Sequence, residues 1–317
     1  MSRQANPVAS PAPVCTAPTE QPSTPPAVPR PEPTHAGPPA QASVAGPAAA
    51  PAQPLRIGIF DSGVGGLSVL QAIGARLPGA QLLYAADTAH APYGDRDERF
   101  LCERSQRIAD FLVAQGAQMI VVACNTATAA AVAALRRAAP ELPLVGVEPG
   151  VKPAVALSAA RRIGVLATTR TLASEKFRRL AQTHAKGATL VLQACPGLAD
   201  AIEAADAQGS GLDVLVERYC APLRAAGVDV AVLGCTHYVF ARALFEQALP
   251  GVQLVDTADA VARQTARLAA DIAGAVTPPA GAAAPALRAW SSGAPAVLAA
   301  FARRWLGRDV DVQDMRC

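Results

Sequence analysis

Lysine is scarce in this 317-residue chain, which has only three lysines among its 28 basic residues. They are Lys152, Lys176 and Lys186, and none lies in a recognisable cofactor motif. This scarcity limits chemistry that needs a lysine amine, such as the Schiff base formed with pyridoxal phosphate. The 28 basic residues are nearly balanced by 25 acidic residues, and no block of like charge occurs. The sequence therefore argues against nucleic acid and against a membrane surface as partners.

The chain also lacks a long apolar run free of polar residues. Residues 116–135 come nearest to a membrane span, but Gln118, Asn125 and Thr128 interrupt them, and a strand followed by a helix explains them better. The start MSRQANPV has neither the basic region nor the apolar core of a secretory signal. Seven cysteines, an odd number, do not suggest a disulfide scaffold. We therefore expect a reduced protein in the cytoplasm.

Residues 1–54 contain no Leu, Ile, Phe, Trp or Tyr, and they hold 15 of the 28 prolines. Such a segment cannot bury enough apolar surface to offset the entropy lost on ordering. We predict that it is disordered. An unstructured extension or a mis-assigned start codon accounts for it, and a tail that binds a partner is the alternative.

From Leu55 onward, short apolar runs alternate with stretches of helical spacing. This alternation predicts an α/β fold with parallel sheets that helices cover on both faces. After Ala275, a Pro/Ala/Gly-rich stretch is interpreted as a linker, and the last block, 287–315, with a helix over 294–306, is expected to dock on a domain already formed. The predicted strands are 56–60, 82–86, 119–123, 144–147, 162–167, 189–193, 230–234 and 252–256.

Two halves of the chain resemble each other. RIGIFDSGVGG and RIGVLATTRT lie 106 residues apart, counted from Ile57 to Ile163, and the cysteines of VVACNTA and VLGCTHY, Cys124 and Cys235, lie 111 apart. A near-constant offset is typical of a duplicated α/β unit, although chance similarity would also explain it. Both cysteines follow an apolar strand, where parallel α/β proteins bind ligands. Two facing halves would place the two thiols on opposite walls of one cleft.

Other kinds of site find less support. Cys124, Cys235 and His237 could bind a metal, but no C-x-x-C or H-x-x-x-H spacing accompanies them, and we predict no metal. A Cys–His nucleophile at Cys235 would leave Cys124 unexplained. The loop DSGVGGLS at 61–68 could hold an anion on its N–H groups, but Ser68 replaces the third glycine of the dinucleotide pattern.

The remaining cysteines are given no chemical role. Cys102 and Cys220 lie in helical patterns and are assigned to core packing, and Cys195 before Pro196 is interpreted as a turn residue. The last two cysteines, Cys15 and Cys317, are expected in mobile ends.

Two opposed thiols can invert a carbon that carries a carboxylate and a proton. One thiol removes the proton from one face, and the other returns a proton to the opposite face. A free thiol with a pKa of about 8.5 is mostly protonated at neutral pH, so the surroundings must hold one of the pair as a thiolate. Each well-placed acid–base group contributes roughly 10²–10⁴-fold to the rate. Because no lysine lies in a cofactor motif, a route without cofactor is favoured.

Several motifs resemble those of the glutamate racemase family, within the aspartate/glutamate racemase superfamily. The pairing of VACNTA with GCTHY is highly specific, and the resemblance extends from about residue 55 to 315. The motifs are FDSGVGGLSVL (60–70), PYG (92–94), VVACNTATA (121–129), ACPGLADAIE (194–203), LGCTHY (233–238) and SSGAP (291–295).

The resemblance implies two Rossmann-like parallel-sheet domains related by pseudo-two-fold symmetry, with the active site in the cleft between them. Domain A would comprise 55–148 and 257–317, and domain B would comprise 149–256. The implied enzyme is an amino-acid racemase, an isomerase that interconverts L- and D-glutamate without cofactor by a two-base mechanism. It would supply D-glutamate for peptidoglycan, and so for cell wall biogenesis and cell shape. An aspartate racemase is the nearest alternative, and a catalytically silent binding protein on this fold is another.

The resemblance also assigns roles to residues. Cys124 would be the base for the D-enantiomer and Cys235 the base for the L-enantiomer. Asp61 near Cys124, and Glu203 with His237 near Cys235, would tune the proton transfers. The positions that would bind substrate are Asp61, Ser62, Tyr93, Gly94, Asn125, Thr126, Thr236 and His237.

The chain departs from the family pattern in places. Val239 stands where the family usually has proline, and Gly197 and Leu198 replace an aromatic run that precedes Glu203. Taken singly, polar residues such as Ser62 would be interpreted as helix caps or turn formers, and only their grouping around the two cysteines favours a site. The sequence leaves the oligomeric state open, with a homodimer among the options.

Overall fold

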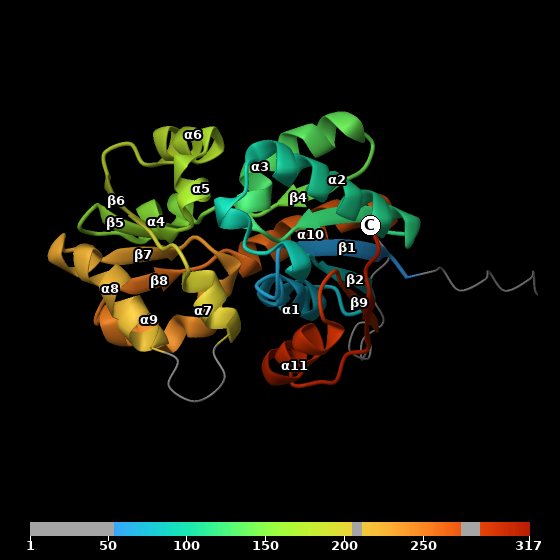
Figure 1. Cartoon of the computed structure of the whole chain (residues 1–317). Coiled ribbons are helices and arrows are strands. Elements are labelled where there is room, and N and C mark those ends of the chain that lie inside the picture. Colours follow the sequence, from blue (N-terminus) through green and yellow to red (C-terminus); the bar gives the residue numbers. More distant parts are fainter. Residues whose placement is uncertain (1–53, 205–210, 274–285) are drawn as a thin grey trace, which may run out of the picture. The chain divides into compact units, whose positions relative to one another are not determined.

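All eight strands that the sequence predicts are present, each displaced by at most one residue at either end. The computed structural model describes residues 54–204, 211–273 and 286–317 (Figure 1). The segment 1–54, which the sequence predicts to be disordered, lies outside the described residues except for Pro54, and so does nearly all of the predicted linker.

The larger sheet has six parallel strands in the order β10-β9-β2-β1-β3-β4. Its inner strands are almost wholly buried, so they consist of continuous apolar runs instead of alternating polar and apolar residues. The six strands are β1 (Arg56–Asp61), β2 (Gln81–Ala86), β3 (Met119–Val122), β4 (Leu144–Gly146), β9 (Ala286–Ser291) and β10 (Val312–Asp314).

The smaller sheet repeats the central part of the larger one. Its order, β6-β5-β7-β8, corresponds to β2-β1-β3-β4. The register corresponds too, because Ile57 of β1 pairs with Met119 while Ile163 of β5 pairs with Val230. The internal resemblance in the sequence is therefore a structural repeat. The four strands are β5 (Arg162–Ala167), β6 (Thr189–Ala194), β7 (Val230–Leu233) and β8 (Gln253–Val255).

Helices cover both faces of each sheet, and apolar clusters fill the space between (Figure 1). On the larger sheet, one face carries α1 (Leu67–Arg76), α10 (Ala258–Ala273) and α11 (Pro295–Leu306), and the other carries α2 (Glu98–Ala114) and α3 (Asn125–Ala138). In the described part of the chain, no helix is both long and apolar enough to cross a bilayer. The smaller sheet packs with α4 (Val151–Leu157), α5 (Thr169–Ala173), α6 (Glu175–His184), α7 (Leu198–Ala204), α8 (Leu212–Ala225) and α9 (Arg242–Ala248).

The last block of the chain is more than a docked helix. β9 pairs along its whole length with β2, and β10 extends the sheet beyond β9. The expected helix and the docking of this block are confirmed, but its two strands were not predicted, and Ala286, assigned to the linker, begins one of them. Only the second half of β9 is buried, and Arg288 interrupts its apolar pattern, so its residues have only weak strand periodicity.

The predicted domain boundaries fall between the two sheets. Strands of the larger sheet come from residues 56–146 and 286–314, and those of the smaller sheet come from 162–255. The described residues nevertheless belong to one compact unit. The division at 148/149 and 256/257 therefore stays a prediction.

Candidate active site

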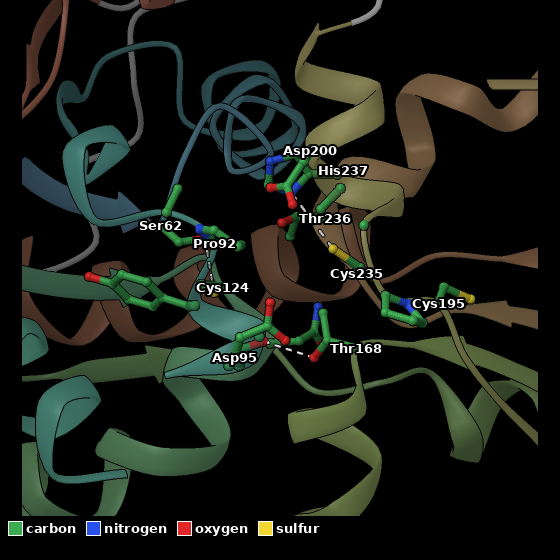
Figure 2. A pocket seen from close by; sticks show the side chains of 18 of the residues that line it. Ser62, Pro92, Asp95, Cys124, Thr168, Cys195, Asp200, Cys235, Thr236 and His237 are labelled. Atoms are coloured by element: carbon green, nitrogen blue, oxygen red, sulfur yellow. Dashed lines mark hydrogen bonds between the residues drawn. The ribbon is translucent and has the colours of Figure 1, made fainter. Parts of the chain in front are cut away.

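One pocket lies at the carboxyl ends of the central strands of both sheets (Figure 2). Ser62 and Thr168 directly follow β1 and β5, and Cys124 and Cys235 lie two residues beyond β3 and β7, all at the sheet edge where parallel α/β proteins bind ligands. The pocket brings together every site residue that the sequence analysis singled out: Asp61, Ser62, Tyr93, Gly94, Cys124, Asn125, Thr126, Glu203, Cys235, Thr236 and His237.

Cys124 caps the N-terminus of α3. Its Sγ accepts a hydrogen bond from the Ala127 N–H at 3.5 Å and lies 3.6 Å from Ser62 Oγ. The helix terminus and these donors favour a thiolate. Burial, followed by the nearby Asp61 carboxylate, outweighs them and raises the pKa of the Cys124 thiol well above its usual range. This shift favours the protonated form of Cys124 at neutral pH.

Cys235 begins a chain of hydrogen bonds. Its Sγ lies 3.6 Å from His237 Nδ1, and His237 Nε2 lies 2.6 Å from Glu203 Oε1. Burial opposes a charged imidazole, but the contacts with Cys235 and Glu203 raise the pKa of His237 well above its usual value. Burial likewise opposes ionisation of Glu203, yet His237 holds the pKa of that carboxyl below its usual value. The arrangement is an imidazolium between a carboxylate and a sulfur atom.

The glycine-rich loop that follows β1 packs against Glu203 and His237. The Val64 N–H donates to Glu203 Oε1 at 3.1 Å. A Cβ on Gly63 would collide with Glu203 Oε1, and one on Gly65 would collide with His237 Nδ1. The loop does hold an anion on its backbone, as the sequence suggested it could, and that anion is the chain's own Glu203 carboxylate.

Asp61 joins the two halves of the pocket. Its carboxylate is fully buried and accepts a hydrogen bond from Thr236 Oγ1 at 3.0 Å and another from the Ser62 N–H at 2.6 Å. Burial raises the pKa of Asp61, although the charge of His237 partly offsets it. Asp61 is the last residue of β1, and Thr236 comes shortly after β7. The hydrogen bond between their side chains therefore links the strand ends of two different sheets.

The start of α3 supplies polar groups next to Cys124. Asn125 Oδ1 is buried and has no hydrogen-bond partner among the described residues. Thr126 Oγ1 lies 3.0 Å from Thr168 Oγ1 and 3.4 Å from Thr171 Oγ1, both from the smaller sheet's side. A buried acceptor without a partner is costly, so Asn125 is suited to receive a hydrogen bond from a bound molecule.

Tyr93 and Gly94 belong to η2 (Tyr93–Asp95), which forms one wall of the pocket. The Tyr93 hydroxyl donates its proton to Asp87 Oδ2 at 2.5 Å, so that proton is not available to a ligand. Gly94 lies against Thr168, since a Cβ there would stand 3.5 Å from the Thr168 Cβ.

Sequence reasoning missed several pocket residues. Thr168 follows β5 as Ser62 follows β1, so the internal repeat could have identified it. Cys195, interpreted as a turn residue, also lines the pocket. Asp95 and Asp200 line it as well and belong to no motif that would have singled them out.

The charges of the pocket are mostly negative. Four carboxylates line it, those of Asp61, Asp95, Asp200 and Glu203, and no lysine or arginine appears among its described lining residues. Burial, followed by the charge of Glu203, raises the pKa of Asp200. In the described part of the chain, no group of three His, Cys, Asp or Glu side chains is arranged as metal ligands.

Comparison with known proteins decides the family. Residues 67–265 match the Asp/Glu/Hydantoin racemase family. The glutamate racemase of Pseudomonas aeruginosa (strain PAO1) is 51% identical over 213 residues, which are 67% of this chain and 80% of that protein. The chain belongs to the Asp/Glu/Hydantoin racemase family. As a member of this family it is an enzyme, a racemase of the isomerase class.

Solved structures of the family share the fold. A glutamate racemase isoform from Bacillus anthracis superposes with a TM-score of 0.75 at 29% identity, covering 83% of this chain and 98% of that one. Escherichia coli glutamate racemase, solved with L-glutamate and an activator, gives a TM-score of 0.69 at 30% identity, covering 82% and 97%. The two parallel-sheet halves of this racemase are therefore those of the family.

Proposed function

We propose that this racemase interconverts L- and D-glutamate without a cofactor, with Cys124 and Cys235 as its two acid–base groups. One observation carries the proposal: the two thiols stand at equivalent strand ends of a repeated α/β unit and line the same pocket. The relatives and solved neighbours named glutamate racemase support glutamate as the substrate.

In the proposed reaction, the Cys235 thiolate removes the α-proton of L-glutamate. The Cys124 thiol then donates its own proton to the opposite face of the same carbon, which yields D-glutamate. Cys235 is left as a thiol and Cys124 as a thiolate, so the enzyme is set for the reverse reaction. Exchange of these protons with solvent restores the starting form.

Different surroundings suit each thiol to its step. The His237 imidazolium, held by Glu203, stabilises negative charge on the Cys235 sulfur. The raised pKa of Cys124 keeps its proton available for donation. When Cys124 becomes a thiolate, the α3 terminus and the Ala127 N–H stabilise it. We assign Asp61 to the Cys124 side and the Glu203–His237 pair to the Cys235 side.

Substrate binding in this pocket relies on neutral donors. Glutamate brings two carboxylates and one ammonium, and no lysine or arginine is found among the described lining residues. We propose that hydroxyl and amide groups hold the carboxylates, and that the pocket's own carboxylates hold the ammonium. The binding positions are Asp61, Ser62, Tyr93, Gly94, Asn125, Thr126, Thr236 and His237, with Tyr93 contributing its ring and backbone.

Racemisation assays with both enantiomeric pairs test the proposal. We expect optical rotation to disappear from either enantiomer of glutamate without added cofactor, and aspartate to react far more slowly. Fast aspartate turnover with inert glutamate would make this an aspartate racemase. No reaction with either amino acid would favour a catalytically silent binding protein.

We further propose that the enzyme acts in the cytoplasm and supplies D-glutamate for peptidoglycan. Growth of a bacterial strain that depends on added D-glutamate tests this role. Expression of the chain should remove the requirement, and expression of the Cys124→Ser variant should not. Continued dependence in the presence of the active enzyme would contradict the role.

A further inference from the structure

A buried ion pair lies behind the pocket wall and takes no part in the proposed proton transfers. Asp87 directly follows β2 and is fully buried, and Arg104 of α2 is only 5% exposed. Arg104 Nη2 donates to Asp87 Oδ1 at 2.7 Å, and Nε donates to Oδ2 at 3.1 Å. Burial would raise the pKa of Asp87, but hydrogen bonds from Arg104 and Tyr93 bring it below its usual value. The pair is therefore ionised at neutral pH.

Asp87 holds the pocket wall. Residues 91–95 all line the pocket and belong to no strand. The Tyr93 hydroxyl in the middle of this segment donates to Asp87 Oδ2. The Asp87 N–H in turn donates to the Asp61 carbonyl at 3.0 Å, so Asp87 is fixed to the strand end that carries Asp61. The carboxylate thus ties the wall to the edge of the sheet.

Arg104 is itself held from a second direction. Its Nη1 donates to the main-chain oxygen of Cys317 at 2.9 Å, and the nearby Met315 N–H donates to the Ser291 carbonyl of β9 at 2.8 Å. Cys317 was expected in a mobile end and given no chemical role; its main-chain oxygen completes the surroundings of Arg104. The guanidinium therefore has little freedom to turn away from Asp87.

We propose that Asp87 and Arg104 are positioning residues that set the affinity of the pocket for its substrate through the Tyr93 hydroxyl. Tyr93 and Gly94 bring the wall against Thr168 on the other side of the pocket. Without the hydrogen bond between Tyr93 and Asp87, residues 91–95 would adopt several orientations in the free enzyme. Ordering them when substrate binds would cost free energy and weaken affinity, while the thiols and their partners would stay unchanged. This inference rests on the proposed racemase function.

A purely structural role predicts something different. A buried ion pair is costly to desolvate, and it often adds little net stability over an apolar replacement. Removal of one partner nevertheless leaves the other charge buried and unpaired, so a purely structural pair would lower the melting temperature of such a variant and leave KM unchanged. A positioning pair changes KM, and it does so through the Tyr93 hydroxyl on Asp87 Oδ2, while His90 Nδ1 lies 3.0 Å from the other oxygen, Oδ1.

The test is a double-mutant cycle between Asp87→Asn and Tyr93→Phe. The Tyr93→Phe variant keeps the ring and leaves no charge unpaired, so it is expected to fold even if Asp87→Asn is unstable. We expect Tyr93→Phe to raise KM for glutamate roughly tenfold, the size of effect that losing a hydrogen bond to a charged group produces, with kcat within about threefold of the parent. The double variant should be no worse in KM than the poorer single variant.

Two further variants refine the test. Arg104→Lys keeps the positive charge but cannot make the bidentate hydrogen bonds to Asp87. The KM of this variant should therefore lie between those of the parent and of Arg104→Gln. The matched control is Asp229→Asn, because Asp229 bonds Ser158 and the Ala160 N–H away from the pocket. It should lower the melting temperature and leave KM within about twofold of the parent.

The outcomes separate this inference from the proposed function. If the parent enzyme does not racemise glutamate, the proposed function fails. If the parent is active but Tyr93→Phe leaves KM unchanged, the positioning role is overturned. Independent, additive effects of Asp87→Asn and Tyr93→Phe on KM would also overturn it, because Asp87 would then act by another route.

Discussion

At the scale of single residues, the two thiols differ in what surrounds them. Cys124 meets a helix terminus and a buried carboxylate, whereas Cys235 meets an imidazolium. The Cys124 thiol is therefore suited to donate a proton, and His237 lies 3.6 Å from the Cys235 sulfur, where the proposed two-base inversion would place negative charge. Under the proposed mechanism, equivalent positions in the repeated fold take complementary roles.

Replacing either cysteine by serine should abolish racemisation. A serine hydroxyl is a much weaker acid than a thiol, so each of Cys124→Ser and Cys235→Ser should lower kcat by at least about 10³-fold. Loss of optical rotation measures the rate, and far-UV circular dichroism checks the fold. Cys102→Ser is the matched control, because Cys102 lies on α2 away from the pocket. Full activity in either pocket variant would contradict the two-base mechanism.

Removing the Glu203 charge should shift the pH profile. Glu203 helps to raise the pKa of His237, so in Glu203→Gln the imidazolium loses its proton at a lower pH. The alkaline limb of kcat/KM for L-glutamate should therefore move to lower pH. Glu217→Gln, which alters an exposed pair with Arg224, should leave the profile in place. An unchanged profile in Glu203→Gln would show that the imidazolium does not assist Cys235.

The same shifts predict how the His237–Glu203 pair stabilises the fold. The raised pKa of His237 contributes stability that is complete below its unfolded value of about 6.5 and disappears as pH rises through the folded pKa. The lowered pKa of Glu203 contributes stability above its unfolded value of about 4.3, lost as pH falls through the folded pKa. Both contributions are complete between about pH 4.3 and 6.5.

At the scale of elements, the glycines of the loop between β1 and α1 make room for two of the proposed acid–base partners. Gly63 and Gly65 leave room for Glu203 and His237, which come from α7 and η3 (Thr236–Ala241). The sequence showed the glycines and the backbone donors but could not show what approaches them, since Glu203 lies 139 residues beyond Val64. The contact depends on how the two halves face each other.

Gly65→Ala should impair catalysis more than stability. Its new Cβ would displace the His237 ring from Cys235, so kcat for L-glutamate should fall by roughly 10²-fold or more. Gly251→Ala is the matched control, because that glycine has a φ of +76° and open space around it. The control should lose about 1 kcal/mol of stability and retain activity. Equal kcat in the Gly65→Ala variant would contradict the assigned role of His237.

At the scale of the whole molecule, the local pattern of the sequence predicted most of the fold. Continuous apolar runs identified eight strands, and the repeat predicted that the two cysteines would share a pocket. β9 was missed because its apolar pattern is broken by Arg288 and its burial comes from pairing with β2, some 200 residues away in sequence. Asp87 and Arg104 were missed for a similar reason: they stand 17 residues apart in no motif, and only the packing of α2 on the sheet brings them together.

The most direct test of the account follows deuterium during the reaction of L-glutamate in D₂O without added cofactor. Two bases on opposite walls predict that the first D-glutamate formed carries deuterium at the α-carbon, while the remaining L-glutamate still carries protium. D-glutamate that retains protium would indicate a single base that serves both faces. That result, or the absence of any exchange, would contradict the central claim that Cys124 and Cys235 act as a pair.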